Sequence, residues 1–406
     1  MVLTRQGWAL GAAAFALVAA GRFFGTLELF LLGAAAGALL LVVVLRAVFV
    51  RIELAVRREV HPPRVHAGTP SRIDLEITNR GSRRTPVLRL LDAVSGTRGA
   101  DLGLAPLDRG AAVRAAYRLP TERRGLVQIG PLHLLLTDPF GLTAVRIRAA
   151  GRADLTVYPR IDPISALPET TGHDPDAVEE TPSSLGRTGE EFFALRPFQI
   201  GDELRKVHWP ATARYDELLV RQTELPRQGR ATVLLDLRSD VHSEPSLDLA
   251  VSAVASIITA TRRSGDLIRL VATDGTDSGF IPGNAAYTAI LEYLATVPRS
   301  AAASLTRLLD SLSRTTSHGG ALVVVSGELG RHDRTRIDAL RHRYATLTTV
   351  TIERSAWDPR APVRDDDTDP PGLHEVRVRR DVSFPAAWNR AVGARARTRR
   401  TTGVLR

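Results

Sequence analysis

Three residues of a short central segment have side chains that can transfer protons. Glu191 and Asp202 carry carboxylates and His208 carries an imidazole, and general acid–base catalysis uses these groups. No nucleophile and no metal-ligand spacing accompanies them. The segment therefore admits a hydrolase that uses these three residues, but its pattern favours a structural role.

Arginines alternate with carboxylates along the same segment, residues 189–229. An arginine fork binds a carboxylate through two hydrogen bonds, so this alternation predicts an ion-pair network that fixes the segment's shape. Trp209 is expected to be a packing or partner anchor rather than a platform for a stacked ligand. The alternating groups are Arg196, Arg205, Arg214 and Arg221 with Glu191, Asp202 and Glu224.

Composition removes several classes of protein. The chain of 406 residues has no cysteine, which excludes disulfides, thiolate zinc sites, iron–sulfur clusters and a cysteine nucleophile. It has no G-x-x-x-x-G-K-[ST] motif, so any ATP hydrolysis must be supplied by another protein. Lys and Arg number 54 against 44 Asp and Glu, but they are dispersed and no recognition motif is present, so we expect no nucleic-acid partner.

Two apolar stretches within residues 1–50 predict a transmembrane helical hairpin that anchors these groups. Residues 7–20 and 29–45 are uncharged, and about 20 helical residues cross a hydrocarbon core of about 30 Å. Arginines flank both outer ends of the hairpin, whereas Arg22 stands alone in its turn. We therefore expect the domains that follow on the cytoplasmic side of the plasma membrane. The small residues spaced for close helix contact are Gly7, Gly11, Gly33 and Gly37.

Residues 51–160 change to short alternating strands, which predicts a β-sandwich-like module. Ile73, Leu75 and Ile77 alternate with charged residues, as in a half-buried strand. Residues 161–188 are rich in proline, acidic and hydroxyl side chains, and predict a linker. Further strands are expected at residues 87–91, 112–119, 125–129, 132–136, 143–148 and 155–158.

Residues 230–393 alternate strands with helices, which predicts a doubly wound α/β domain. The apolar run at residues 231–237 is typical of a central parallel strand, and the next segment is helical with Gly265 as its stop. Further strands are expected at residues 267–272, 321–326, 347–352 and 375–378, a helix at 386–392, and a basic tail at 394–406.

Residues 189–224 resemble the signature segment of the domain of unknown function 58 family, which reads G-x-E-F, L-R-x-Y, G-D, R-x-I-x-W, A-R and L-x-V-R-x-x-E. Phe198 and Val207 stand where the family often has tyrosine and isoleucine. Family members also begin with a transmembrane hairpin and a β-rich module, so the resemblance covers essentially the whole chain. The signature residues expected to form a binding surface are Glu191, Phe192, Arg196, Gly201, Asp202, Arg205, Trp209, Arg214, Arg221 and Glu224.

The family's C-terminal part resembles von Willebrand factor A domains, in which a D-x-S-x-S loop after the first strand holds a divalent cation. Here the loop is Asp236-Leu-Arg238-Ser-Asp240, so a cation replaces a hydroxyl ligand. The later acidic position, in Ser326-Gly327-Glu328, is also atypical. We therefore expect no metal and no cofactor, with Asp236 and Asp240 as the ligands if Mg²⁺ does bind.

The resemblance implies a function as well as a fold. Family members are commonly encoded near MoxR-type AAA+ ATPases and transglutaminase-like membrane proteins. We therefore expect a membrane-anchored, non-enzymatic scaffold or adaptor that faces the cytoplasm and works with such an ATPase in the assembly or maturation of other proteins. The alternatives are a metal-dependent adhesion module and, less favoured, the hydrolase described above.

Overall fold

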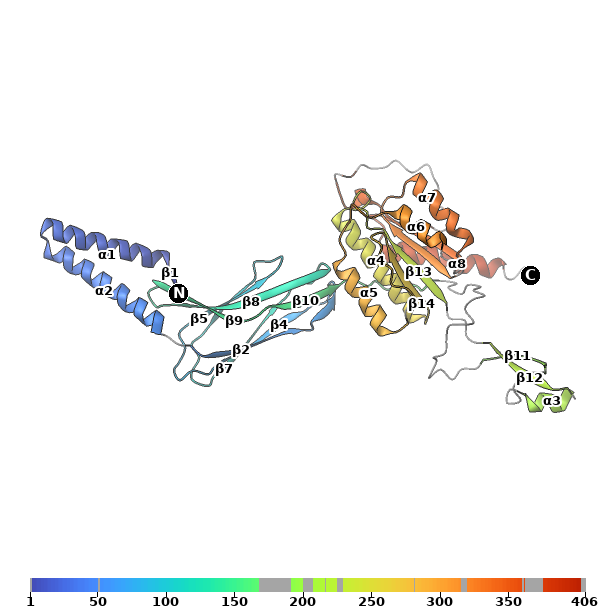
Figure 1. The fold of residues 1–406 in the computed structure, drawn as a ribbon, viewed down its shortest axis with the longest axis horizontal. Helices are drawn as coiled ribbons and strands as arrows, with labels where there is room; N and C mark the ends of the chain where they lie inside the picture. The colour runs from blue at the N-terminus through green and yellow to red at the C-terminus, as the bar shows by residue number, and fades with distance from the viewer. Residues whose placement is uncertain are drawn as a thin grey trace. The chain divides into compact units, whose positions relative to one another are not determined.

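The computed structural model describes residues 2–49, 52–167, 191–199, 207–215, 217–224, 229–280, 282–314, 320–359, 361 and 375–402; of residues 2, 191–194, 196, 221–224 and 394–402 it describes only the backbone. The chain forms two compact units, Met1–Arg160 and Ile161–Arg406. The first holds a helix pair and β-sheets, and the second holds a hairpin and an α/β domain (Figure 1).

The apolar N-terminal segment forms two helices, α1 (Arg5–Phe24) and α2 (Leu27–Phe49). With about 1.5 Å per residue they are about 30 and 34 Å long, and both are long and apolar enough to cross a membrane. Gly25 ends α1 with a φ of 69°, a left-handed conformation that suits glycine. Large apolar side chains are exposed along both helices, among them Phe15, Phe23, Leu31 and Leu41.

Small residues let the two helices approach each other. Only some of them are the glycines that the sequence predicted for this contact. A Cβ on Gly33 would lie 2.7 Å from the backbone nitrogen of Val18, and one on Gly21 would lie 2.5 Å from that of Phe30. Gly37 faces open space. Of the four predicted glycines, Gly33 is therefore at the close contact, Gly11 meets a Leu40 methyl, and Gly7 packs outside the hairpin against the Leu142 carbonyl.

The β-region of the first unit consists of two sheets. One has seven strands, with the order β1-β9-β8-β10-β3 and with β5 and β6 added alongside β8; the other has three, in the order β2-β4-β7. The strands of the larger sheet are β1 (Val2–Leu3), β3 (Arg64–His66), β5 (Leu88–Val94), β6 (Ala100–Leu104), β8 (Gly125–Thr137), β9 (Thr143–Ala150) and β10 (Ala153–Tyr158). Those of the smaller are β2 (Leu54–His61), β4 (Arg72–Asn79) and β7 (Ala112–Arg118).

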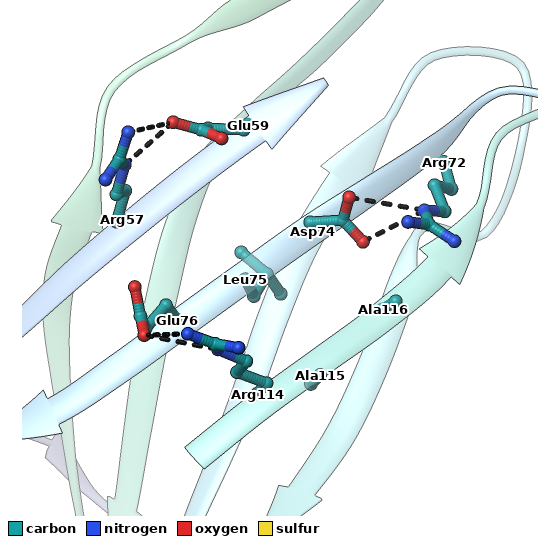
Figure 2. Close-up of a pocket in the computed structure, with 9 residues that line it drawn as sticks. All are labelled: Arg57, Glu59, Arg72, Asp74, Leu75, Glu76, Arg114, Ala115 and Ala116. Atoms are coloured by element: carbon teal, nitrogen blue, oxygen red, sulfur yellow. Dashed lines mark hydrogen bonds and ion pairs between the residues drawn. The ribbon is translucent and has the colours of Figure 1, made fainter. Parts of the chain in front are cut away.

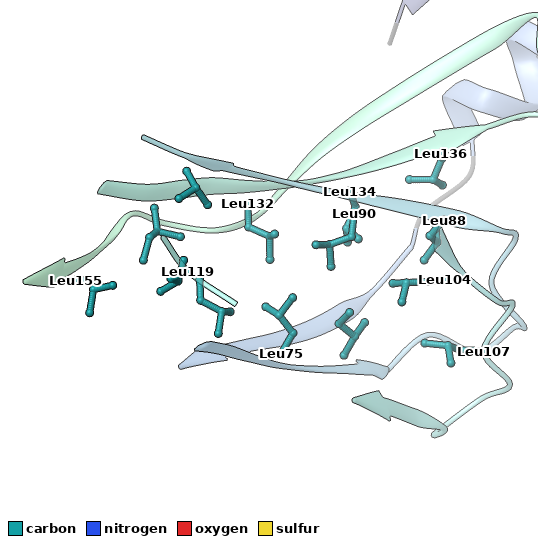
Figure 3. Packing of buried hydrophobic residues seen from close by; sticks show 14 of the residues in the cluster. Leu75, Leu88, Leu90, Leu104, Leu107, Leu119, Leu132, Leu134, Leu136 and Leu155 are labelled. Carbon is teal, nitrogen blue, oxygen red and sulfur yellow. The ribbon is translucent and has the colours of Figure 1, made fainter. Parts of the chain in front are cut away.

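One hydrophobic core joins the two sheets. Ile73, Leu75 and Ile77 of β4 are buried, which confirms the alternating face predicted for that strand. They belong to the same cluster as Leu88 and Leu134 of the larger sheet. Figure 3 shows these leucines filling the space between the sheets. The strands predicted at residues 125–129 and 132–136 form one continuous strand, β8.

A buried ion pair crosses this core. Arg58 of β2 donates from Nη1 to Asp92 Oδ1 of β5 at 3.0 Å, and their side chains are only 4% and 0% exposed. The Tyr117 hydroxyl of β7 donates to Asp92 Oδ2 at 2.7 Å; burial, followed by this bond, raises the pKa of Tyr117. A Cβ on Gly130 would lie 2.7 Å from Arg58 Nη1, so this glycine makes room for the guanidinium.

The α/β domain has five parallel strands in the order β14-β13-β15-β16-β17. All but the first residue of β13 are buried, which confirms the prediction of a central strand covered on both faces. From β13 the chain passes to β14 on one side and then to β15 on the other, so the strand order changes direction beside β13. The strands are β13 (Arg230–Leu235), β14 (Leu267–Ala272), β15 (Ala321–Ser326), β16 (Thr346–Ile352) and β17 (Glu375–Val378).

Helices cover both faces of this sheet (Figure 1). Leucines of α6 and Ile337 of α7 share a buried cluster with Leu234 and Val324, whereas α4 packs on β13 to β16 and is absent from that cluster. Gly265 follows the last turn of α4 with a φ of 86°, as its predicted stop. The helices are α4 (Glu244–Arg263), α5 (Asn284–Thr296), α6 (Leu305–Arg314), α7 (Arg331–Asp338) and α8 (Phe384–Thr402), so α8 runs through much of the expected tail.

The first residues of the expected linker are bonded to this domain. The buried Trp388 indole donates to the Ser165 carbonyl at 2.8 Å, and the Ser165 nitrogen donates to Asn389 Oδ1 at 2.8 Å. The Asp162 nitrogen donates to Ser256 Oγ at 2.9 Å. Residues 161–167 are therefore an attached part of the α/β domain, and the rest of the predicted linker lies outside the described residues.

We predict that Asp92→Asn lowers the local free energy of unfolding of the β-region by about 3 to 5 kcal/mol, because it leaves the buried Arg58 charge unpaired. Hydrogen–deuterium exchange of peptides from β5 and β7, in the full-length protein, measures this. Asp101→Asn is the matched control: Asp101 pairs with Arg89 in the same sheet, but the two side chains are 49% and 56% exposed, so the loss is below about 1 kcal/mol. Equal exchange in the two variants would contradict a supporting role for the buried pair.

Candidate functional site

The signature segment folds as a hairpin with one helix. Strands β11 (Glu191–Pro197) and β12 (Leu219–Glu224) pair antiparallel, and α3 (Trp209–Tyr215) lies between them in sequence. Their register places Glu191 opposite Glu224, and Arg196 opposite Val220. Phe192 and Arg221 also lie on these strands, whereas Gly201, Asp202 and Arg205 lie outside the described residues.

His208 holds the start of α3. Its Nδ1 accepts a hydrogen bond from the Ala211 nitrogen at 3.1 Å, which satisfies a free donor of the helix, and its own nitrogen donates to the Leu219 carbonyl at 2.8 Å. Thr212 Oγ1 accepts from the Leu219 nitrogen at 3.1 Å. The imidazole therefore has a structural task, and of the predicted acid–base trio Asp202 and the side chain of Glu191 lie outside what the structure describes.

The outer surface of α3 is aromatic. Val207, Ala211 and Val220 are buried, whereas Trp209 is 61% exposed and Tyr215 is 66% exposed. The guanidinium of Arg214 lies 6.0 Å from the centre of the Tyr215 ring. An exposed Trp209 is not packed in the core, and its role as a partner anchor stays a prediction.

The carboxyl edge of the parallel sheet holds the most connected polar group of the α/β domain. Asp236 follows β13 and is fully buried. Arg238 donates to its carboxylate from Nε at 3.1 and 3.0 Å and from Nη2 at 2.8 Å. The same Nη2 lies 2.9 Å from Asp333 Oδ2 of α7, so one guanidinium bridges two carboxylates.

Hydroxyl groups from both neighbouring strands complete the surroundings of Asp236. Ser326, at the end of β15, donates to Asp236 Oδ2 at 2.7 Å, and Thr273, after β14, lies 3.4 Å from Oδ1. In parallel sheets ligands bind where the strand order changes direction, and Asp236 stands at that point, between β13 and β15. The position at which a ligand is expected is thus lined by groups that bind each other.

This arrangement does not fit a divalent cation. Oxygen ligands would have to come from Asp236, but both of its carboxylate oxygens already accept hydrogen bonds from Arg238, whose charge opposes a metal ion. Asp240, the second candidate ligand, is exposed, and its carbonyl accepts from Arg354 at 2.7 Å. Among the described residues, no group of three or more His, Cys, Asp or Glu is placed to hold a metal.

His242 is a buried imidazole beside this pair. Its Nδ1 lies 3.3 Å from Ser246 Oγ, and its Nε2 has no hydrogen-bond partner. Burial lowers the pKa of His242 to about 4, against an opposing effect of the Asp236 charge, and Arg238 lowers it further. His242 therefore stays neutral at physiological pH.

A surface hollow on the three-stranded sheet is lined by ion pairs (Figure 2). Arg72 pairs with Asp74 along β4 at 3.1 Å, and Arg114 pairs with Glu76 across the strands at 3.1 Å. The small side chain of Ala116 leaves the space between them. Because these charges are paired and exposed, the hollow is a solvated charged face rather than a site for chemistry.

Sequence patterns missed part of the edge site. Asp236, Arg238 and Ser326 were placed correctly at strand ends, but Asp333 and His242 were not expected to join them. Asp333 lies 95 residues from Arg238, so only the sheet topology brings the two together. The one local signal was the cation inside the Asp236–Asp240 loop, which needs a carboxylate partner.

We predict that acid weakens the α/β domain through His242. The pKa is 6.5 in the unfolded chain and about 4 in the folded one, so the unfolded chain binds the proton more readily between these values. The free energy of unfolding should be highest above pH 6.5 and fall as the pH is lowered towards 4, by up to about 3 kcal/mol. Urea unfolding followed by fluorescence at several pH values, with Trp388 as the only tryptophan kept in the protein, measures it.

His242→Gln should flatten this pH dependence. His332→Gln, at an exposed histidine of α7, should leave it unchanged. If the free energy of unfolding of His242→Gln falls with pH as steeply as that of the wild type, another group causes the effect.

We predict that Mn²⁺ leaves the unfolding midpoint of the wild-type protein unchanged. Arg238→Ser should lower the free energy of unfolding by about 3 to 5 kcal/mol, because it leaves Asp236 buried without its cation. Mn²⁺ should restore part of this loss in the variant only. Arg341→Ser, which removes an exposed pair with Asp338, should cost less than about 1 kcal/mol. Stabilisation of the wild type by Mn²⁺ would show that the loop accepts a metal.

Comparison with known proteins agrees with the signature residues. Residues 194–360 match the family described as "Protein of unknown function DUF58". Uncharacterised proteins of Mycobacterium tuberculosis and Mycobacterium bovis are 27% identical over 152 residues, which cover 35% of this chain and 48% of theirs. The chain thus spans about half the length of the curated relatives that it matches.

Solved structures resemble only a part of the chain. The CARDB domain of a Pyrococcus furiosus protein has a TM-score of 0.22 at 13% identity and covers 26% of this chain and 93% of its own. A putative ApaA protein of Bordetella pertussis has a TM-score of 0.19 at 10% identity and covers 26% and 94%. Likenesses this low add nothing to the fold described above. The family match spans α3, most of the hairpin and four of the five parallel strands, and residues 194–360 are a domain of the DUF58 family.

Proposed function

We propose that this chain is a membrane-anchored scaffold or adaptor that works with a MoxR-type AAA+ ATPase in the assembly or maturation of other proteins. The helix pair supplies the anchor, and the soluble domains face the cytoplasm. Arg5 and Arg46 lie at the outer ends of the helices, against Arg22 at the turn, which supports this orientation.

The observation that carries this proposal is that the polar groups at the carboxyl edge of the parallel sheet bind one another. Arg238 bridges Asp236 and Asp333, so the charged groups at the expected ligand position are bound to one another. A catalytic or metal-binding role would need those groups to be available to a substrate or an ion. An edge whose charged groups are already bound to one another suits recognition of a protein surface instead.

The finer architecture is part of the same proposal. The two sheets with one core form a β-sandwich-like module. The parallel sheet, with a D-x-R-x-D loop after its first strand, is a doubly wound domain of von Willebrand factor A type in which an arginine replaces the metal ion. On this interpretation, the metal-dependent adhesion role of such domains has given way to metal-independent binding.

The aromatic surface of α3 is the proposed contact with the ATPase. Tryptophan, tyrosine and arginine dominate the energetics of protein interfaces, and this short helix exposes Trp209 at its start and the Arg214–Tyr215 pair at its end. The chain has no phosphate-binding motif, so ATP hydrolysis comes from the partner. A transglutaminase-like membrane protein is a further proposed partner.

A photocrosslinking amino acid at position 209 tests this assignment in the full-length protein in its native membrane. We expect it to capture an AAA+ ATPase, and Trp209→Ala to weaken the complex by about 2 kcal/mol or more, as for an interface anchor. The control position is Leu126, an exposed apolar residue of β8 outside the proposed contact. If position 209 captures neither an ATPase nor a membrane protein, the adaptor assignment is wrong.

A further inference from the structure

The loop at residues 138–142 is a built turn that displays one aromatic side chain. Asp138 accepts hydrogen bonds from the nitrogens of Phe140, at 2.8 Å, and Thr143, and from the Thr143 hydroxyl at 3.0 Å. The Gly141 nitrogen donates to the Asp138 carbonyl at 2.9 Å, and Gly141 has a φ of 68°. Phe140 is nevertheless 61% exposed, so the turn orders a large apolar group that nothing in the described chain covers.

This loop is bonded to the beginning of the first apolar helix. Thr4 donates from its nitrogen to the Leu142 carbonyl at 3.0 Å and from its hydroxyl to the Gly141 carbonyl at 2.5 Å. The same hydroxyl oxygen accepts from the Gly7 nitrogen at 3.1 Å as the N-cap of α1. Gly7 lies against the Leu142 carbonyl, where a Cβ has no room. Helix start and loop are therefore one rigid contact.

Helix length fixes the level of this contact in a bilayer. Helix α1 has 20 residues and is about 30 Å long, which equals the hydrocarbon thickness of about 30 Å. The helix has no spare turn with which to stand above the membrane. Its first turn, and the loop bonded to it, must lie where the hydrocarbon meets the headgroups.

The groups around this level have the composition of a membrane interface. Trp8 is exposed one turn into α1, and Arg5 and Arg46 are exposed at the same end of the hairpin. Tryptophan and arginine side chains prefer the headgroup layer, where they bury apolar atoms and keep polar ones wet, and phenylalanine is among the apolar side chains that interfacial segments bury at this level. Phe140 adds an aromatic ring from a different part of the sequence.

We infer that residues 138–142 form an interfacial loop whose Phe140 side chain inserts into the lipid headgroup region beside α1. The inference rests on the proposed membrane anchor. The loop makes a third attachment of the β-region to the membrane, besides the two helices, and its partner is the lipid surface itself. Insertion is shallow, because the Asp138 carboxylate two residues away is held in its charged form. Burial is the largest single effect and raises the pKa of Asp138, but the hydrogen bonds from Thr143, Phe140 and Leu142 together lower it below its ordinary value.

The absence of cysteine allows a direct test with single labels. Phe140→Cys carries the environment-sensitive fluorophore NBD in the full-length protein, in nanodiscs of phosphatidylethanolamine and phosphatidylglycerol. We expect blue-shifted emission, with stronger quenching by lipids that carry a nitroxide near the headgroup than by lipids that carry it at the chain end. Leu126→Cys is the matched control, an exposed apolar residue of the first unit at the far end of β8, and its label should remain in water.

Leu39→Cys in the middle of α2 separates failure of the loop from failure of the anchor. Its label should be quenched most by the chain-end nitroxide. If it is, while the label at position 140 behaves like the one at position 126, the interfacial loop is refuted and the anchor stands. A label at position 140 that is blue-shifted but not quenched by either lipid also refutes it, since contact between copies then covers the loop. Loss of quenching at position 39 refutes both.

Discussion

A carboxylate withdrawn from water needs a fixed positive charge beside it, and the α/β domain depends on how Asp236 meets this requirement. Its charge is compensated from two residues away, by Arg238. Because Asp236 follows β13, which pairs on both sides, the hydroxyl groups that bind it come from both neighbouring strands, and Asp333 of α7 binds its partner Arg238. The pair thus fixes the loops around it, and it fills the one place where a parallel sheet of this topology would receive a ligand.

The β-region also buries a carboxylate that needs a positive charge beside it, but there the ion pair joins two sheets. Arg58 and Asp92 stand on opposite sheets, so their attraction spans the core rather than closing an edge. The core accommodates a guanidinium because Gly130 has no side chain, and Tyr117 takes up the remaining carboxylate oxygen. A buried ion pair contributes little net stability, but it permits one alignment of the two sheets and penalises others.

The bounds of a strand could be predicted from the sequence where its local pattern agrees with the environment that the fold gives it. The strands β14 and β15 match their predicted bounds because each is a largely apolar run covered by helices. Strand β17 also matches, because its buried valines, Val376 and Val378, alternate with charged residues. Strand β2 was missed because Arg58 occupies an inward position between Val56 and Val60, which breaks the apolar alternation that identifies a strand. Strand β8 was predicted as two strands because Gly130-Pro131 is typical of a turn.

At the candidate site, Asp236 and Arg238 were found from their loop. No local signal marks Asp333 or His242 as their neighbours, since that proximity is produced by the order of the strands.

The short strand β1 has a consequence for how the protein is made. Val2 and Leu3 precede the first apolar helix, yet they pair with Ala144 and Thr143 of β9. A ribosome adds about 5 to 20 residues per second, so roughly ten seconds or more separate the synthesis of these partners. By then both helices have left the ribosome. If the two helices span a membrane as proposed, they return the chain to the side from which it started, so β1 and the β-region lie on the same side in either orientation. Insertion of only one of the two helices would separate them, and would leave β9 without an edge partner and Thr4 without Leu142. Completion of the sheet is in this sense a check that both helices were inserted together.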